Sequence, residues 1–255
     1  MRFQDKVVWV TGASSGIGEA VAKAFSREGA KLILSSRNQS ELERVRGNCA
    51  GDGHRVLPLD LTRPETFADA AKQAGNVDIL VHAGGVSQRS LVKDTTLQTD
   101  RAIMELNFFG TVGLTKAVLP SMLGRKSGHV VPISSVVGYV GTPLRSTYAA
   151  SKHALHGFFD SLRAEVGKDG ITVTIVCPGY IRTNVSRNAL TGDGSAFGQM
   201  DRTHERAMLP EECARRIVNA VAKRKQELVV GGLETWAVPL KRFFPRLVSR
   251  IVRMK

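Results

Sequence analysis

The sequence has little cysteine and no uninterrupted apolar stretch of the length that crosses a membrane. Three cysteines among 255 residues, Cys49, Cys177 and Cys213, are an odd number, and their spacing suits neither a disulfide framework nor a zinc site. No run approaches the roughly 18 apolar residues of a spanning helix. The first residues have neither a long apolar core nor a small-residue cleavage site of a signal peptide. We therefore expect a reduced, cytoplasmic protein that is soluble or at most attached to a membrane surface.

Acidic residues are absent after Glu234. The chain carries 36 Lys and Arg against 23 Asp and Glu, a net charge of +13, and residues 240–255 hold six of the positive charges. Apolar residues recur between them at spacings of three and four, as in a helix at a membrane interface, and Pro245 divides the pattern into two short pieces. Two interpretations of this basic amphipathic segment, 234–255, stay open. It packs over the substrate mouth or a subunit neighbour, or residues 240–255 make peripheral membrane contact.

Short β-branched runs alternate with longer stretches of helical periodicity, which predicts βαβ units around a parallel sheet. Several runs are apolar almost throughout, as expected of strands that helices cover on both faces. Repeats, linkers and changes of composition are lacking, so we predict one domain over residues 1–255. The predicted strands are Lys6–Val10, Lys31–Ser35, Arg55–Leu59, Val77–Val81, His129–Ile133, Ile171–Cys177 and Glu227–Val230. The predicted helices are Ile17–Glu28, Gln39–Cys49, Pro64–Ala74, Thr96–Leu123, Thr147–Lys168 and Pro210–Lys223. The fold class is α/β, a doubly wound sheet of about seven parallel strands.

Residues 184–209 depart from this alternation. The stretch is polar, contains glycine and has weak periodicity. Its length favours a mobile substrate loop over a site, and a plain surface excursion is the alternative.

Glycines 12, 16 and 18 follow the first predicted strand and open the first predicted helix. They allow a tight turn, close approach of a ligand to the backbone and close packing of helix on strand, with helix amides facing an anion. This is the usual place for a pyrophosphate. The same residues match the G-x-S-x-G nucleophile elbow of hydrolases, but the turn follows the first strand, and hydrolases build several strands before it.

Three motifs in this order, "TGASSGIG", "YAASK" and "PGYIRT", resemble the short-chain dehydrogenases/reductases, and the resemblance reaches to about residue 232. It implies a single Rossmann-like domain, a nicotinamide cofactor and a ketone or secondary alcohol as the small-molecule substrate. The loop 184–209 looks most like that of members with lipid-like or steroid-like substrates. The resemblance also implies a homodimer or homotetramer formed through the long helices that include Asn107 and Tyr148.

Tyr148 and Lys152 lie four residues apart, on one face of a predicted helix. A free phenol titrates near ~10, and a nearby ammonium lowers that value. The resemblance makes Tyr148 the proton donor, and Lys152 the group that lowers the pKa of Tyr148 and binds the nicotinamide ribose. It makes Ser135 the hydroxyl that orients the substrate oxygen, and Asn107 the holder of a water in a proton relay.

The second predicted strand ends in Ser36 and Arg37, where an acidic side chain would accept from the adenosine ribose hydroxyls. A guanidinium instead binds a 2′-phosphate, so NADP(H) is preferred and NAD(H) is the alternative. The resemblance assigns Asp60 and Leu61 to the adenine. It extends the cofactor site to Gly12, Ser14, Ser15, Gly16, Ile17, Gly18, Ala83, Gly84, Lys152, Pro178, Gly179, Ile181 and Thr183.

One motif departs from the family. Where most members have Asn-Asn-Ala-Gly after the fourth strand, this sequence has His82, Ala83, Gly84 and Gly85. We expect His82 to be structural and cofactor binding to persist with changed local bonding. His153 and His156 lie three residues apart without an evident third ligand, so no metal site is expected.

The leading hypothesis is an NADPH-dependent carbonyl reductase, reversible as an alcohol dehydrogenase. Within the enzyme class the alternative is a 3-oxoacyl-carrier-protein reductase, whose basic surface would face an acidic carrier. A non-catalytic cofactor-binding regulator or nucleic-acid binder is the alternative of another class. The intact set of Asn107, Ser135, Tyr148 and Lys152 argues against it, and no nucleic-acid partner is expected.

Overall fold

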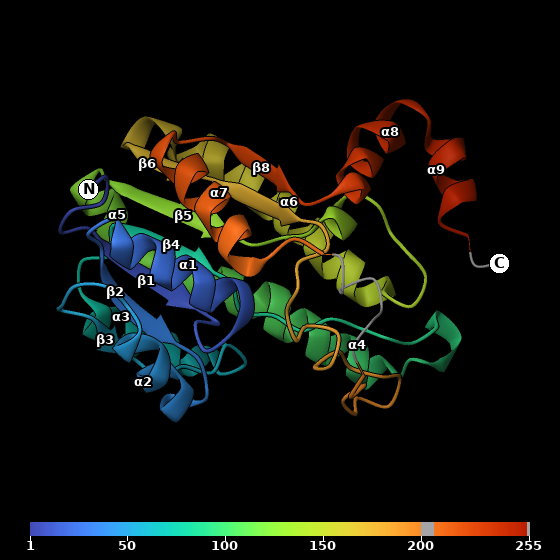
Figure 1. Ribbon diagram of the computed structural model, residues 1–255, viewed down its shortest axis with the longest axis horizontal. Helices are drawn as coiled ribbons and strands as arrows, with labels where there is room; N and C mark the ends of the chain where they lie inside the picture. Colours follow the sequence, from blue (N-terminus) through green and yellow to red (C-terminus); the bar gives the residue numbers. More distant parts are fainter. Residues whose placement is uncertain (200–206, 254–255) are drawn as a thin grey trace.

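The computed structural model describes residues 1–199 and 207–253. Six parallel strands form one sheet in the order β3-β2-β1-β4-β5-β6, with helices on both faces (Figure 1). The strands are β1 (Val7–Thr11), β2 (Lys31–Ser35), β3 (Arg55–Val56), β4 (Ile79–His82), β5 (Gly128–Pro132) and β6 (Ile171–Val173). The predicted α/β class is confirmed.

The strand predicted over Ile171–Cys177 is two strands. It is interrupted at Thr174, whose hydroxyl contacts His129 Nε2 at 2.7 Å and donates to the Lys225 carbonyl. The second half, β7 (Ile175–Pro178), pairs with β8 (Glu227–Val230) in a separate two-stranded sheet. A single bridge, Ile133 to Val176, keeps β7 beside the end of β5. The predicted seven-stranded sheet is therefore one sheet of six strands and one of two.

Alternate residues of β1 point into apolar layers on opposite faces of the main sheet. Val8 and Val10 pack with α1, α2 and α7, whereas Trp9 packs with α3, α5 and α6. The helices are α1 (Gly16–Arg27), α2 (Gln39–Gly47), α3 (Phe67–Ala74), α4 (Leu97–Met104), α5 (Gly110–Arg125), α6 (Ser146–Val166), α7 (Pro210–Ala222), α8 (Ala237–Phe243) and α9 (Pro245–Ile251). Both faces of the sheet are covered, as the apolar strands predict.

The third strand and the third helix are each three residues shorter than predicted. β3 stops at Val56, two residues before Pro58, which has no N–H to donate to a ladder. The helix predicted from Pro64 begins with a 3₁₀ turn, Pro64–Thr66, closed by a bond from the Phe67 amide to the Pro64 carbonyl. α3 starts only after that turn.

The helix predicted over Thr96–Leu123 is divided by a π-helical turn, Glu105–Phe109, between α4 and α5. Among the described residues, the run Leu97–Arg125 is the one helix long and apolar enough to cross a membrane by length and composition. Polar residues interrupt this helix, so a count of consecutive apolar residues does not find it. Leu114, Val118 and Met122 of α5 are buried against the sheet, so its apolar character serves the core.

Candidate active site

The candidate residues gather at the carboxyl edge of the parallel strands. This is the edge where ligands bind in open α/β sheets. The glycine turn follows β1, Ala83 follows β4, and Ser135 lies shortly after β5. Pro178 ends β7, which the Ser134 amide joins to β5 by a 2.7 Å bond to the Val176 carbonyl.

Glycine is required sterically in the turn after β1. Gly12 adopts a left-handed φ of 64°, and a Cβ there would lie 2.6 Å from the Gly84 nitrogen. A Cβ at Gly18 would lie 2.2 Å from the Gly12 carbonyl oxygen. Ser15 caps α1 without a side-chain hydrogen bond. The first-turn amides of α1 therefore remain available to an anion.

The segment Pro178–Thr183 lies across from this turn. A Cβ at Gly16, whose φ is 59°, would lie 3.2 Å from the Thr183 methyl group. Ile181 is buried, and the Ser135 hydroxyl donates to the Pro178 carbonyl at 3.2 Å. The glycine turn on one side and this segment on the other form a cradle that fits a dinucleotide, with the predicted residues Ser14, Ile17 and Gly179 in the same two segments.

Lys152 and Tyr148 share one face of α6. Lys152 is 5% exposed, its Nζ lies 5.7 Å from the centroid of the Tyr148 ring, and it donates to the Ile133 carbonyl at 2.9 Å. Burial lowers the pKa of Lys152 to about 8. The lysine can therefore exchange a proton near neutral pH.

Burial raises the pKa of Tyr148. A hydrogen bond with the Ser135 side chain and the positive charges of Arg145 and Arg89 act in the opposite direction. Lys152, the predicted tuner, is directed to the Ile133 carbonyl instead. The two arginines, neither of which the motifs pointed to, supply the positive field at the phenol.

Asn107 is buried within the π-helical turn. Its Oδ1 accepts from the Val86 amide at 2.8 Å, and its Nδ2 donates to the Val86 carbonyl at 2.9 Å and to Ser151 Oγ at 3.0 Å. A Cβ at Gly85 would lie 3.1 Å from Asn107 Oδ1 and 3.5 Å from Lys152 Nζ. The structure therefore brings Asn107 and Lys152 to one place, and the water relay stays a prediction.

Sequence reasoning missed Gln88, which is fully buried and caps α6. Its Oε1 accepts from the Thr147 amide at 2.8 Å and from the Tyr148 amide at 3.2 Å. Its Nε2 lies within hydrogen-bond distance of the hydroxyls of Ser90, Thr95 and Ser146. A helix cap 59 residues away in sequence leaves no local signal, so a single sequence could not reveal it.

His82 is structural, as expected. It is buried, and its Nε2 lies 2.8 Å from Thr115 Oγ1. Burial lowers its pKa to about 3, so the imidazole is neutral at physiological pH. Its Nδ1 and the neighbouring Thr11 hydroxyl are buried without a hydrogen-bond partner among the described residues. The changed cofactor bonding expected from the departure at residues 82–85 stays a prediction.

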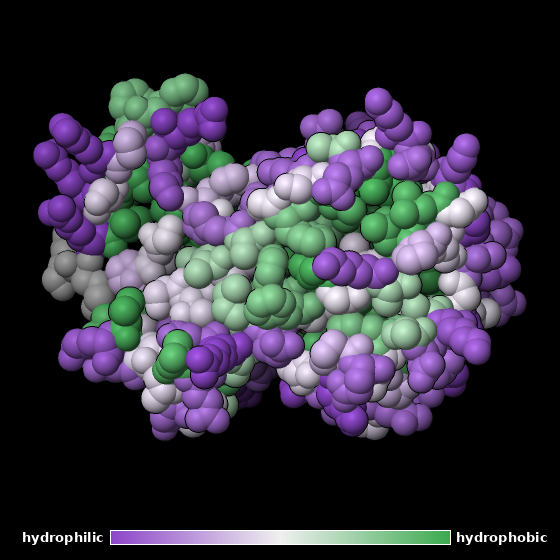
Figure 2. All heavy atoms as spheres, turned by 180° about the vertical axis from the view of Figure 1, so that it is seen from behind, coloured by the Kyte–Doolittle hydropathy of each residue, from purple (hydrophilic) through white to green (hydrophobic). Residues whose placement is uncertain are grey.

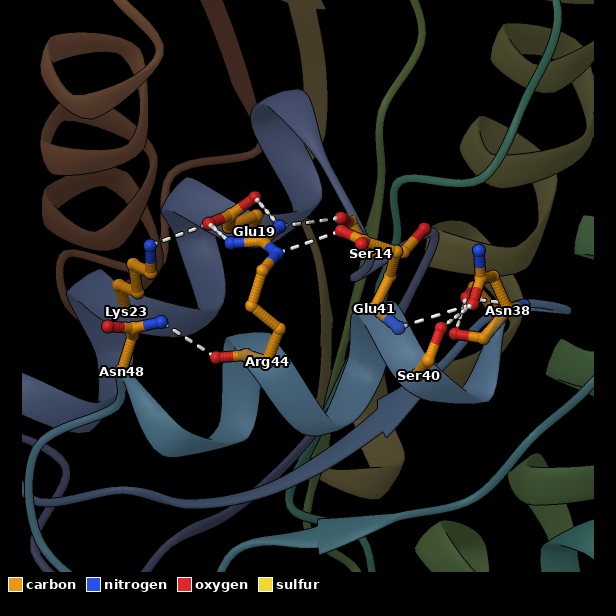
Figure 3. Close-up of polar contacts among 9 residues, drawn as sticks. Ser14, Glu19, Lys23, Asn38, Ser40, Glu41, Arg44 and Asn48 are labelled. Atoms are coloured by element: carbon orange, nitrogen blue, oxygen red, sulfur yellow. Dashed lines mark hydrogen bonds and ion pairs between the residues drawn. The ribbon is translucent and has the colours of Figure 1, made fainter.

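Two arginines lie in the region that follows β2, Arg37 in the turn directly after the strand and Arg44 on α2. Arg44 is engaged, with bonds to both carboxylate oxygens of Glu19 at 3.0 and 2.9 Å, to Glu41 at 2.8 Å and to the Ser14 carbonyl at 3.3 Å (Figure 3). Arg37 is exposed and makes no ion pair with another described residue. Of these two guanidinium groups, that of Arg37 is therefore the one available to a phosphate.

Asp60 is held in place by its own turn. Its Oδ1 accepts from the Thr62 amide and hydroxyl, both at 2.9 Å. Burial acts to raise the pKa of Asp60, but these bonds and the charges of Arg37 and Arg63 outweigh it, and the pKa is lowered. The adjacent Leu61 is buried where a Cβ at Gly84 would be 2.7 Å from its Cδ1. Leu61 therefore lies against Gly84, the residue that faces Gly12.

The first part of the predicted loop 184–209 is tied down. Leu190 exchanges backbone bonds with Ser87 and Arg89 at 2.9 and 2.8 Å. The Thr96 amide, ahead of α4, donates to the Gly192 carbonyl at 2.9 Å. Residues 200–206 of the loop lie outside the described residues. The described part is thus attached to the segment that caps α6.

Comparisons with known proteins agree with this geometry. The family model for short chain dehydrogenases matches residues 6–193. The chain is 45% identical over 263 residues to dehydrogenase/reductase SDR family member 7B of Danio rerio, covering 98% of this chain and 85% of that protein. It is 44% identical to the protein of that name from Mus musculus, covering 98% of this chain and 81% of that protein.

Two solved structures extend the likeness to the fold. A short-chain dehydrogenase from Streptomyces avermitilis has a TM-score of 0.82 at 32% identity, covering 98% of this chain and 97% of that chain. A serine dehydrogenase complexed with NADP+ has a TM-score of 0.81 at 25% identity, covering 89% and 95%. With the family model matching well over half of its residues, this chain belongs to the short-chain dehydrogenase family.

Proposed function

We propose that this protein catalyses the NADP(H)-dependent interconversion of a ketone and a secondary alcohol on a lipophilic substrate, with Tyr148 as the acid–base group. Membership of the short-chain dehydrogenase family makes it an oxidoreductase acting on CH–OH or C=O with a nicotinamide nucleotide. The observation that carries the finer proposal is the convergence of Ser135, Tyr148 and Lys152 beside the glycine cradle.

The cradle residues Gly12–Gly18 and Pro178–Thr183 would hold the cofactor, which supplies a hydride to the carbonyl carbon. The Ser135 hydroxyl exchanges its bond to the Pro178 carbonyl for one to the substrate oxygen, and it holds that oxygen next to the Tyr148 phenol. Tyr148 gives its proton to that oxygen as negative charge develops there, and the alcohol forms. Lys152, with a pKa near 8, returns a proton to the phenolate, with Asn107 beside its Nζ.

The likeness of one loop supports the class of substrate, and exposed apolar surface supports the assembly. The likeness of loop 184–209 to members with lipid-like or steroid-like substrates supports a lipophilic ketone. The rear face of the molecule carries a broad apolar region across its middle (Figure 2), and Phe109, at the end of the π-helical turn, is 52% exposed. The exposed apolar surface supports a homodimer or homotetramer.

The test of the proposed function is NADPH oxidation with a panel of ketones, read beside direct NADPH binding. We expect oxidation that depends on a lipophilic ketone. Binding without ketone-dependent oxidation would favour the non-catalytic regulator instead. Faster turnover of 3-oxoacyl groups on an acidic carrier, with docking that weakens steeply as salt is added, would favour the carrier-protein reductase.

Replacing Arg37 by glutamine is expected to raise the KM for NADPH by about 10- to 100-fold, because a charge-assisted hydrogen bond contributes about 1.5–3 kcal/mol. The KM for NADH should not change, since NADH has no 2′-phosphate. Arg46→Gln is the matched control, because Arg46 is also exposed but is paired with Glu43 on α2. Equal KM values for NADPH in the two variants would contradict the role of Arg37.

Replacing Gln88 by leucine is expected to lower kcat about tenfold and the free energy of unfolding by about 1–3 kcal/mol, because the amides of Thr147 and Tyr148 lose their acceptor. Gln88→Glu keeps an acceptor at the helix N-terminus and should restore kcat. The readout is kcat against the KM for NADPH, which should stay constant. A loss of stability with unchanged kcat would mean that Gln88 only supports the fold.

A further inference from the structure

The chain ends in two short helices that project from the body of the molecule (Figure 1). Residues 233–253, here called the C-terminal arm, comprise a 3₁₀ turn, α8 and α9, with the break at Phe244 that Pro245 predicts. The arm holds six of the thirteen large apolar side chains that are exposed in the described residues, and these are Leu233, Trp236, Phe243, Phe244, Leu247 and Ile251. The described residues leave them exposed.

Helix α9 is amphipathic. Leu247 and Ile251 lie one turn apart on one face, and Arg246 and Arg250 lie one turn apart on the adjoining face. Val248 is buried, 4% exposed, and α9 packs against α8. Figure 2 shows apolar residues at the outer end of this arm with hydrophilic ones on its flank. This arrangement is that of a helix lying in a membrane interface.

The cations of the arm are not neutralised within the described part of the chain. Arg242, Arg246, Arg250 and Arg253 are exposed, and none forms an ion pair with a described carboxylate. The sequence offers no acidic residue after Glu234. The arm therefore carries positive charge beside exposed aromatic and aliphatic side chains.

The positive charge of the arm determines which kind of surface it can bind. Six of the net +13 charges lie in residues 240–255, so the rest of the chain still carries +7. Covering the arm with a second copy would bring like charges together. An anionic surface neutralises the arginines, and only one with an apolar interior also takes the apolar side chains.

We propose that the C-terminal arm docks on a bilayer of anionic phospholipids. Trp236, Phe243 and Phe244 enter the headgroup region, and the arginines meet lipid phosphates. Each basic residue near such a surface contributes about 1 kcal/mol. Neither the family's chemistry nor the cofactor site requires this contact.

The arm is fastened beside the candidate site. Glu234 accepts from the amide of Tyr180 at 2.7 Å, two residues after Pro178. Lys241 Nζ donates to the carbonyl of Tyr139 at 2.5 Å, four residues after Ser135. Docking of the arm thus brings the carboxyl edge of the sheet to the bilayer, and, resting on the proposed function, lets a lipophilic ketone be taken from it.

Vesicle flotation of the chain of residues 1–255 tests the docking. We expect the protein to float with vesicles of phosphatidylcholine and phosphatidylglycerol and to remain behind with phosphatidylcholine alone. The triple variant Arg242→Gln, Arg246→Gln, Arg250→Gln should bind at least about tenfold more weakly, given about 1 kcal/mol for each charge. The triple variant Phe243→Ser, Phe244→Ser, Ile251→Ser should also lose flotation. Lys168→Gln, Lys223→Gln, Lys225→Gln removes three exposed charges elsewhere and should float normally.

Equal flotation of the wild type and the arginine variant would overturn the proposal, and so would no flotation of the wild type. Dissociation of an oligomer by the serine variant, seen by sedimentation velocity with no change in flotation, would assign the arm to a second copy. Binding to duplex DNA without flotation would assign it to nucleic acid. All variants should keep the melting temperature and the turnover of a small soluble ketone, so failure of docking and failure of the proposed activity are separate results.

Discussion

Replacing Tyr148 by phenylalanine is expected to lower kcat for ketone-dependent NADPH oxidation by about 10²- to 10⁴-fold, the range of a positioned acid–base group. The substitution removes one oxygen atom and leaves the ring that packs over Lys152. It should therefore leave the fold and NADPH binding intact. Steady-state kinetics with NADPH binding measured in parallel is the check.

Tyr139→Phe is the matched control for this prediction. Tyr139 also lies after β5, and its ring packs edge-on against His156 with centroids 4.4 Å apart. Burial raises the pKa of Tyr139, and its hydroxyl lies 3.9 Å from the Cys177 thiol. The control should keep kcat. Comparable activity of Tyr148→Phe and the wild type would remove Tyr148 from the reaction.

The environment of Tyr148 explains why its motif alone is an incomplete description. Without cofactor, burial raises the pKa of the phenol, and the opposing groups are Ser135, Arg145 and Arg89. A raised pKa keeps the phenol protonated, which is the state that a proton donor to a ketone requires. Arg145 directly precedes α6 and Arg89 follows β4, so the positive field at the phenol comes from two separate segments of the chain.

β-branched runs, helical periodicity and proline positions predicted most of the fold, because their effects depend only on residues close in sequence. β-branched runs became parallel strands, and Pro245 broke the final helix where predicted. The division of Ile171–Cys177 was not predictable, since it depends on Thr174 meeting His129 on a neighbouring strand. The π-helical turn was missed for a similar reason, because Asn107 there is fixed by Val86, 21 residues earlier.

The candidate site likewise contains residues that the sequence predicted and residues that it could not predict. The spacing of Tyr148 and Lys152 places them on one helix face whatever the rest of the chain does, and the glycines reveal themselves because no other residue fits the turn. Gln88 gave no such signal, because its role arises only when the segment after β4 reaches the start of α6. A single sequence reveals residues whose role depends on the conformation of their own segment. It does not reveal residues, such as Gln88, that stabilise an element far away in the sequence.

Replacing Lys152 by methionine is expected to have opposite effects on stability and activity. Burial lowers the pKa of Lys152 from 10.5 to about 8. Between these values the unfolded chain binds a proton that the folded chain does not, so the free energy of unfolding rises with pH from about 8 to 10.5. Below pH 8 the cost of the buried charge is fully present, at about 3 kcal/mol.

Methionine fills the space of the lysine stem without the charge and loses only the bond to the Ile133 carbonyl, about 1 kcal/mol. The cofactor-free variant should therefore be more stable at pH 7 by about 2 kcal/mol in urea unfolding, and the difference should shrink by pH 10. Its kcat should fall about 10²-fold, as for removal of one electrostatic group from an active site. Lys168→Met, at an exposed lysine, should change neither quantity. A variant less stable than the wild type at pH 7 would show that Lys152 supports the fold. A more stable variant that has lost turnover would show that the buried charge of Lys152 destabilises the fold and serves the reaction.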